Sequence, residues 1–193
     1  ESLRFMNAIG VDLDSPTMQQ VDFYTAHECL LLPYEEAMTR IDSTSGNYYD
    51  TSAHLLWVGE RTRQPGFAHF EFVRGLENPL GVKISDKASP EDVLEILDTF
   101  NPENIPGRVT LITRMTAEGI REKLPAIINA VQEAGKNAVW VCDPVHGNGF
   151  QADNGYKTRS FDAIREEVIA FFDVHRECGS HPGGIHLEMT GKD

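Results

Sequence analysis

Several features that define other classes of protein are absent from this sequence. It contains no run of about 18 consecutive apolar residues, so it predicts no membrane-spanning helix. Basic residues are scarce, with 17 Lys and Arg against 30 Asp and Glu, and the net charge of −13 disfavours a nucleic-acid partner. Cysteine is also rare: Cys29, Cys142 and Cys178 lie far apart without a CxxC pair, which indicates a reducing compartment rather than a disulfide framework.

The beginning of the chain lacks both an initiator Met and the pattern of a signal peptide. It reads ESLR, without the basic, apolar and small-residue order of a secretory leader, so we expect a processed or excerpted chain. Neither a Walker loop nor a dinucleotide-binding fingerprint occurs. The 193 residues and the 40% apolar content suit one domain, 1–193, with a packed core.

From residue 55 onward, short apolar runs alternate with segments of helical periodicity. The runs are rich in β-branched residues and mostly do not alternate with polar ones, as expected for buried parallel strands; they lie at 55–58, 80–84, 109–112, 138–142 and 184–187. The pattern predicts an α/β protein with five β/α units in residues 55–193. The loop at 147–155 is long enough to be functional.

Three helices are expected between these strands, and a weaker one at 67–76. One begins at Ser89 and Pro90, one spans 120–131 and ends near Gly135, and one spans 161–178 with its residues 164, 168, 171 and 172 facing inward. Residues 1–54 are expected to be a mostly helical lead-in, with a helix at 21–38 and a short strand as an alternative at 29–32. Five or six strands are too few for a closed eight-stranded barrel, so the sheet is open or part of a barrel lies elsewhere.

A chemically capable residue ends or closely follows each of the five apolar runs. In chain order these residues are Glu60 with Arg61 and Arg63, then Lys83, then Arg114, then Asp143 with His146, and finally Glu188. Because the carboxyl ends of parallel strands share one face, we expect these side chains to converge there. Three cations suit a phosphate or a phosphate-plus-carboxylate ligand, and a His with a Glu suits a divalent metal.

Each of these residues also has a simpler interpretation. A single charged residue after a strand fits a solvated loop, and a single His fits a structural hydrogen-bonding role; five such positions in five successive units favour a common site. For His27 with Glu28, and for His54, the structural interpretation is preferred. His175 and His181 are assigned no chemistry, because they flank a helix end where a cation is favoured by the dipole. The residues alone predict an anion-binding β/α enzyme, with metal dependence left open.

Long motifs make the sequence similar to one known family. GERTRQ at 59–64 resembles the signature of class II, plant-type 3-deoxy-D-arabino-heptulosonate-7-phosphate (DAHP) synthases. The further motifs follow in the family's order and spacing, and the resemblance covers nearly the whole chain: TAHECLLLPYE at 25–35, LGVK at 80–83, LITRM at 111–115, DPVHGN at 143–148 and GSHPGGIHLEMTG at 179–191.

The resemblance implies a (β/α)8 TIM barrel of which five or six units are present. It implies a metal-dependent transferase of the shikimate pathway and of aromatic amino acid biosynthesis, which condenses phosphoenolpyruvate with erythrose 4-phosphate. The family needs a divalent cation, for which we expect Mn²⁺, with Co²⁺ as an alternative. The implied phosphoenolpyruvate-binding residues are Glu60, Arg61, Lys83 and Arg114, the implied metal ligands are His146 and Glu188, and the implied catalytic residues are Lys83, His146 and Lys157. A homo-oligomer is expected, in the cytoplasm or, in a photosynthetic eukaryote, the plastid stroma.

The chain departs from the family pattern in ways that leave two alternatives open. A metal-binding Cys on an early strand, an Asp beyond the last motif and an Arg in a KPRS motif are missing, and Cys29 lacks the expected GGDC context. The resemblance therefore implies a chain that is incomplete at both termini. PGF follows GERTRQ where LDG is usual, and Val145 and Gly149 flank the His motif. The alternatives are another phosphate-binding, metal-dependent β/α lyase and a truncated, non-catalytic chain that acts as a binding or assembly partner.

Overall fold

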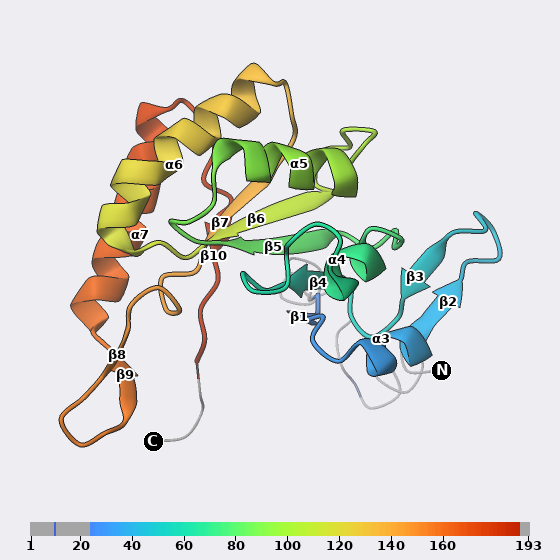
Figure 1. Ribbon diagram of the computed structural model, residues 1–193, viewed down its shortest axis with the longest axis horizontal. Helices are drawn as coiled ribbons and strands as arrows, with labels where there is room; N and C mark the ends of the chain where they lie inside the picture. Colours follow the sequence, from blue (N-terminus) through green and yellow to red (C-terminus); the bar gives the residue numbers. More distant parts are fainter. Residues whose placement is uncertain (1–9, 11–23, 190–193) are drawn as a thin grey trace.

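A six-stranded parallel sheet organises the chain (Figure 1). The computed structural model describes residue 10 and residues 24–189. The strands lie side by side in the order in which they occur along the chain: β1 (Ala26–Glu28), β4 (Leu55–Val58), β5 (Leu80–Ile84), β6 (Val109–Thr113), β7 (Val139–Cys142) and β10 (Gly184–Ile185). This architecture confirms the predicted α/β class. A strand order without reversal is that of a barrel wall, not of a doubly wound sheet.

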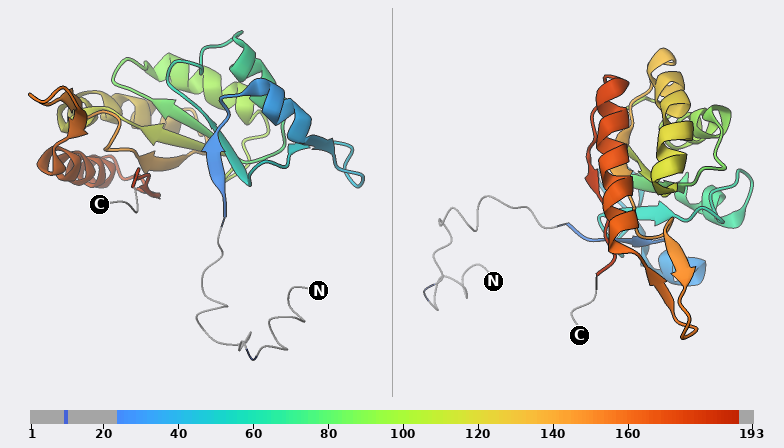
Figure 2. Two further views of the ribbon diagram at one scale, coloured as in Figure 1. Left: turned by 90° about the horizontal axis from the view of Figure 1, so that it is seen from below. Right: turned by 90° about the vertical axis from the view of Figure 1, so that its left-hand side faces the viewer.

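Four helices connect the strands after β4 and pack against one another in a row. They are α4 (Ala68–Val73), α5 (Pro90–Phe100), α6 (Thr116–Glu133) and α7 (Phe161–Glu177). Phe70 of α4 lies 4.6 Å from Phe100 of α5 between ring centroids, α5 contacts α6, and α6 runs beside α7 (Figure 2). The predicted start of α5 is confirmed, because Ser89 and Asp92 form a reciprocal capping box.

The two faces of the sheet have different environments. One face packs against the helices and contributes alternate strand residues to the apolar core, among them Leu56, Val58, Leu80, Val82, Ile84, Val109 and Leu111. The intervening residues, which include Trp57, Gly81 and Lys83, point to the opposite face. None of the helices α4 to α7 covers that face. Trp57 and Lys83 on it line the cavity described below.

The segment before β4 differs from the expectation of a mostly helical lead-in. Residues 24–54 contain one helix, α3 (Leu32–Met38), together with β1 and an antiparallel hairpin of β2 (Thr39–Ile41) and β3 (Tyr48–Asp50). The alternative strand at 29–32 is displaced to β1, which pairs in parallel with β4. The start of the helix expected at 21–38 lies outside the described residues.

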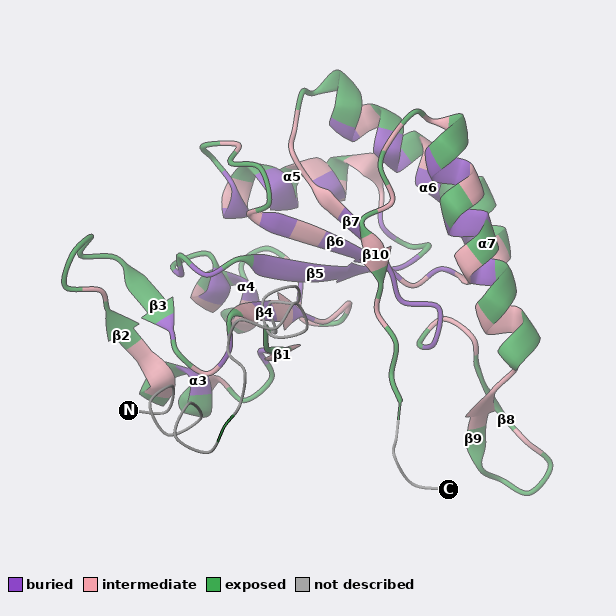
Figure 3. Cartoon of the chain, turned by 180° about the vertical axis from the view of Figure 1, so that it is seen from behind, coloured by how far each residue is buried: buried purple, intermediate pink, exposed green. Residues whose placement is uncertain are grey.

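A second hairpin follows β7 within the long loop of the sequence. Its strands are β8 (Gly149–Gln151) and β9 (Lys157–Arg159), and it projects from the body of the molecule (Figure 2). Both hairpins are largely exposed, whereas β5 is buried throughout (Figure 3). Phe172, expected to face inward, is 38% exposed on α7. No helix in the described part of the chain has the length and apolar character needed to cross a bilayer.

Candidate active site

One cavity of about 560 Å³ opens at the carboxyl ends of the parallel strands. Its size is that of a small-molecule site. The lining comes from every strand of the sheet or the loop that follows it, and from the β8–β9 hairpin: Glu28, Leu30, Trp57, Gly59, Glu60, Arg61, Thr62, Lys83, Arg114, His146, Lys157 and His186. Six strand ends that are distant in sequence therefore meet at one point, and five of them are those of the strand-end pattern.

The cavity concentrates positive charge in an otherwise acidic chain. Arg61, Lys83, Arg114 and Lys157 line it, whereas the net charge of the whole chain is −13. Arg114 donates a hydrogen bond from one guanidinium nitrogen to the His146 carbonyl oxygen, at 2.8 Å. Its Nε is buried and has no partner among the described residues. Buried guanidinium donors without partners are suited to an anionic ligand.

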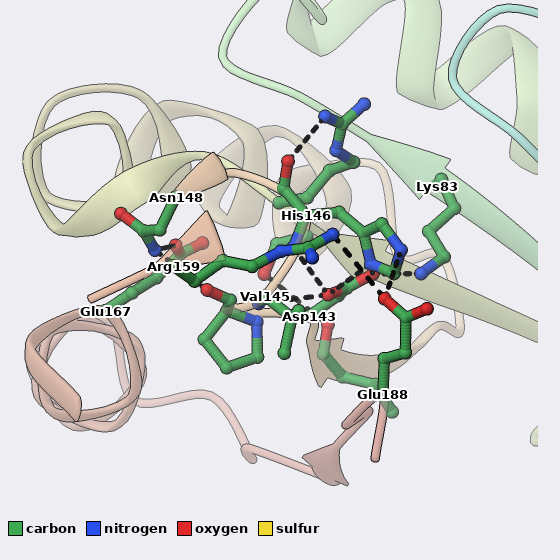
Figure 4. A network of polar contacts seen from close by, with 12 residues as sticks. Lys83, Asp143, Val145, His146, Asn148, Arg159, Glu167 and Glu188 are labelled. Carbon is green, nitrogen blue, oxygen red and sulfur yellow. Dashed lines mark hydrogen bonds and ion pairs between the residues drawn. The ribbon is translucent and has the colours of Figure 1, made fainter. Parts of the chain in front are cut away.

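Lys83 and His146 are held by the same buried carboxylate (Figure 4). Asp143 is fully buried, and its Oδ2 accepts a hydrogen bond from Lys83 Nζ and lies 2.8 Å from His146 Nδ1. Burial raises the pKa of Asp143, but the hydrogen bonds from Lys83 and His146 outweigh burial and lower it below its usual value. Asp143 therefore stays ionised and fixes the orientation of a cation and of an imidazole together.

The remaining nitrogen of His146 points to Glu188. His146 Nε2 lies 3.3 Å from Glu188 Oε2, and Arg159 reaches the same carboxylate oxygen at 3.6 Å. With Nδ1 directed at Asp143, Nε2 is the ring nitrogen that can bind a metal, as in carboxylate–histidine–metal arrangements. One imidazole nitrogen and one carboxylate fit a first-row divalent cation. Within residues 24–189 no group of three or more His, Cys, Asp or Glu side chains could hold a metal ion.

Glu60 ties the end of β4 to the end of β5. Its Oε1 accepts from Arg63 at 3.0 Å, and its Oε2 accepts from the backbone N–H of Ser85 at 2.7 Å. Arg63 is 6% exposed, so this ion pair is buried. Both carboxylate oxygens of Glu60 are thus engaged by the protein, which positions the loop that carries Arg61 beside Lys83.

Six lining residues were not predicted as site residues, and three of them, Glu28, Trp57 and His186, have side chains able to contact a ligand. Glu28, at the end of β1, had been given a structural role; its carboxylate lies over Gly59, where an added Cβ would come within 2.5 Å of Oε1. Trp57 and His186 pack edge to face at 5.0 Å, and Lys83 Nζ lies 5.7 Å from the Trp57 ring centroid. Because side chains of a strand alternate between its two faces, the position of Trp57 between the core residues Leu56 and Val58 was the sequence signal that could have placed it on the cavity face.

His186 and the cysteines are further characterised by their burial. Burial, followed by the nearby Lys83 charge, lowers the pKa of His186, so its imidazole is neutral at pH 7. Burial also raises the pKa of Cys29 to about 12 and raises that of Cys142. Both thiols lie in the apolar core and stay protonated at neutral pH.

Comparisons with known proteins agree with this geometry. The model of the class-II DAHP synthetase family matches residues 1–193. The chain belongs to the class-II DAHP synthetase family. A Catharanthus roseus relative, named probable phospho-2-dehydro-3-deoxyheptonate aldolase, chloroplastic, is 57% identical over 183 residues. A Streptomyces coelicolor relative, named phospho-2-dehydro-3-deoxyheptonate aldolase, is 47% identical over 192 residues. They are covered over 37% and 42% of their lengths, against 95% and 100% of this chain.

In this member of the class-II DAHP synthetase family, the residues predicted from the motifs lie together. Six of them line the cavity: Glu60, Arg61, Lys83, Arg114, His146 and Lys157. The seventh, Glu188, lies at its edge beside His146. Lys157 comes from the β8–β9 hairpin, where its side chain lies over Gly149. A Cβ added at Gly149 would lie 3.1 Å from Lys157 Cε. The individual roles of these residues are taken up as proposals below.

Proposed function

We propose that this chain provides most of the catalytic face of a DAHP synthase, which condenses phosphoenolpyruvate with erythrose 4-phosphate. The observation that carries the proposal is the meeting of Arg61, Lys83 and Arg114, from three successive strand ends, with His146 and Glu188. Family membership supports the same activity. Because the chain spans less than half of the matched relatives, the activity concerns the longer protein of which such a chain is part.

Phosphoenolpyruvate is bound by the cation cluster. Arg61 and Arg114 provide planar guanidinium groups that bind phosphate or carboxylate with two parallel hydrogen bonds. Lys83 adds a point charge whose position is set by Asp143. Glu60 keeps the two strand ends in register through Arg63 and the Ser85 amide. The cluster orients the substrate so that its C3 faces the second substrate.

His146 and Glu188 hold a divalent cation, for which Mn²⁺ is proposed and Co²⁺ is the alternative. When bound, the ion supplies Lewis-acid polarisation of the aldehyde oxygen of erythrose 4-phosphate. Asp143 holds the His146 ring so that Nε2 remains available as a ligand. Two donors do not complete the coordination of such an ion, so we propose that further ligands come from outside the described residues.

The reaction forms a carbon–carbon bond and releases phosphate. C3 of phosphoenolpyruvate bonds to the aldehyde carbon, whose oxygen takes up a proton; water adds at C2, and the C2–O bond to phosphate breaks. Lys157 places a fourth positive charge in the cavity, beside the second substrate or the reacting carbon. Lys83 and Lys157 stabilise negative charge that develops during the reaction, so most of the catalysis is positioning and electrostatic stabilisation.

The architecture proposed for the longer protein is a (β/α)8 TIM barrel, of which this chain forms five or six units in one domain. The sequential strand order and the row of helices on one face support it. A homo-oligomer is proposed. The proposed location is the cytoplasm or the plastid stroma; the second is supported by the Catharanthus roseus relative, which is named chloroplastic.

The test follows the absorbance of phosphoenolpyruvate when erythrose 4-phosphate is added, with Mn²⁺ and then with excess chelator. It is run on this chain and on a version extended at both ends. Turnover that requires both substrates and stops with chelator supports the synthase. Turnover by the extended version alone identifies the chain as one part of the site, and no turnover by either version refutes the proposal.

A second candidate is a non-catalytic chain that acts as a binding or assembly partner. The presence of only two metal donors among the described site residues favours it. Calorimetric titration with Mn²⁺ separates the two candidates, since a chain that binds Mn²⁺ only at millimolar concentration would support the non-catalytic role.

A further inference from the structure

A buried glutamate outside the cavity joins two loops that carry site residues. Glu167 lies in the middle of α7 and is fully buried. Its Oε1 accepts a hydrogen bond from the Met115 backbone N–H at 2.8 Å, and its Oε2 accepts from the Asn148 side chain at 2.6 Å (Figure 4). Met115 follows β6 and Asn148 follows β7, so one carboxylate connects the ends of two neighbouring strands to the helix.

One of these loops carries a residue proposed to bind phosphoenolpyruvate, and the other carries a residue proposed to bind the metal. Arg114 precedes Met115 directly, and His146 lies two residues before Asn148. The guanidinium of Arg114 donates to the His146 carbonyl oxygen at 2.8 Å, which links the loops a second time. Asn148 also donates to the Pro144 carbonyl oxygen at 2.8 Å, so the loop after β7 is closed on itself. The distance between the Arg114 and His146 backbones therefore depends on Glu167.

The backbone around this carboxylate is strained and tightly packed. Thr116, the first residue of α6, has a φ of +66°, which is unfavourable for a β-branched residue and persists only where surrounding contacts impose it. A Cβ at Gly147 would lie 3.1 Å from the Thr116 nitrogen and 3.3 Å from Glu167 Oε2. Burial raises the pKa of Glu167 to about 7, so an ionised carboxylate at this position lowers the stability of the fold. An apolar side chain here would not have this unfavourable effect.

We propose that Glu167 is a positioning residue that sets the spacing between Arg114 and His146, and hence between bound phosphoenolpyruvate and the metal. The inference rests on the proposed function. Glu167 touches neither ligand; it acts through the Met115 amide and the Asn148 side chain. Mutations of groups that hydrogen-bond a metal ligand directly reduce metal affinity or activity by about 10–100-fold, and Glu167, one contact further away, is expected at the lower end of that range.

Glu167→Gln tests the role with little change in shape. Above pH 7 Glu167 is ionised and offers two acceptors, whereas Gln offers one acceptor and one donor, so either the Met115 amide or the Asn148 amide then faces an NH₂ group. The variants are therefore compared above pH 7. Adding Asn148→Asp restores a donor–acceptor pair with Gln, although it loses the bond to Pro144. Glu166→Gln, on the exposed side of the same helix, is the matched control for charge and helix propensity.

The measurements are calorimetric affinities for Mn²⁺ and for phosphoenolpyruvate, the exchange rate of the Met115 amide hydrogen, and Tm. We expect Glu167→Gln to weaken both affinities about tenfold or more and to speed Met115 exchange. The double variant is expected to recover part of both losses, and Glu166→Gln to match the wild type. If Glu167→Gln does not fold, Asn148→Ala removes one of the same contacts from the loop side.

Two results would overturn the inference. A Glu167→Gln protein with a lower Tm but both dissociation constants within about twofold of the wild type would reduce Glu167 to a structural residue. Unchanged Met115 exchange would show that the carboxylate does not hold the loop. A wild-type version extended at both ends that binds neither Mn²⁺ nor phosphoenolpyruvate would overturn the proposed function and the positioning role with it, while faster Met115 exchange in Glu167→Gln would still support the contact itself.

Discussion

Asp143 offers the sharpest test of the site, because one substitution should impair both stability and metal binding. Asp143→Asn keeps the shape of the side chain but leaves Lys83, whose side chain is 8% exposed, as a buried charge without its partner. Breaking a buried pair in this way costs about 3–5 kcal/mol. For a chain of this size that lowers Tm by about 6–20 °C, at about 2–4 °C per kcal/mol.

The same substitution weakens the support of His146. An Asn at this position can still approach Nδ1, but the charge that favours the required tautomer and the basicity of Nε2 is lost. We expect Mn²⁺ affinity to fall about 10–100-fold, as for other outer-shell carboxylates. Thermal unfolding and isothermal titration with Mn²⁺ measure the two effects separately. Asp153→Asn, in the exposed turn of the β8–β9 hairpin, is the control for both.

A paired removal distinguishes the two effects. Combining Asp143→Asn with Lys83→Met removes both charges, and most of the lost stability should return, whereas Mn²⁺ affinity should stay low. The stability contribution of Asp143 in the wild type should also disappear as pH falls below its usual pKa of about 4, because its folded-state pKa is lowered. An Asp143→Asn protein with a Tm within about 2 °C of the wild type and unchanged Mn²⁺ affinity would refute this reasoning.

Further predictions concern the anion site, a close backbone contact and a buried acid. Arg114→Lys should weaken phosphoenolpyruvate binding about tenfold or more in calorimetry, because a lysine cannot make two parallel hydrogen bonds. Gly183→Ala should destabilise the chain by about 1–3 kcal/mol in urea unfolding, since its Cβ would lie 2.8 Å from the Trp140 carbonyl oxygen. The raised pKa of Glu167 should make stability fall as pH rises from 4.5 to about 7, by about 3 kcal/mol, and Glu167→Gln should remove this fall.

The controls for these predictions follow from the structure. Gly184→Ala should be nearly neutral, since a Cβ there meets nothing within 4 Å; an equal loss at Gly183 and Gly184 would contradict the role of the Trp140 contact. Burial lowers the pKa of His175 to about 4, so its contribution to stability rises with pH between 4 and 6.5, opposite to Glu167. The difference between wild type and Glu167→Gln is therefore the quantity to measure, and a flat difference would refute the prediction.

Local sequence signals predicted the elements whose causes are local. The Ser89 capping box marked the start of α5, and Gly135, with a φ of +64°, marked the region where α6 ends. The buried strands were recognisable because an apolar run can be identified without knowing which strand it pairs with. Their carboxyl ends could be placed on one face by the parallel topology alone, and this brought Lys83 and Arg114 to one cavity.

Other features depend on contacts between distant segments and gave no local signal. β1 has only three residues, too few to give a strand pattern in the sequence. It is a strand because it pairs with β4, which is distant in sequence. Asp143 was expected at a strand end, but its partner Lys83 is 60 residues away, so nothing in the local sequence predicted that one carboxylate holds both Lys83 and His146. Glu167 stands next to another glutamate on a helix with the usual charged pattern, so only the fold distinguishes the buried carboxylate from the exposed one.

The carboxylate shared by Lys83 and His146 also has a thermodynamic consequence. Asp143 holds both the lysine proposed to bind an anion and the imidazole proposed to bind a metal, so the free energy of binding one ligand should depend on whether the other is present. An anion that draws Lys83 toward itself weakens the ion pair between Lys83 and Asp143, so Asp143 interacts more strongly with His146. We therefore expect each ligand to raise the affinity of the site for the other. Linkage requires the two factors to be equal. Phosphoenolpyruvate should therefore raise Mn²⁺ affinity by the same ratio by which Mn²⁺ raises phosphoenolpyruvate affinity, and the enhancement should disappear in Asp143→Asn.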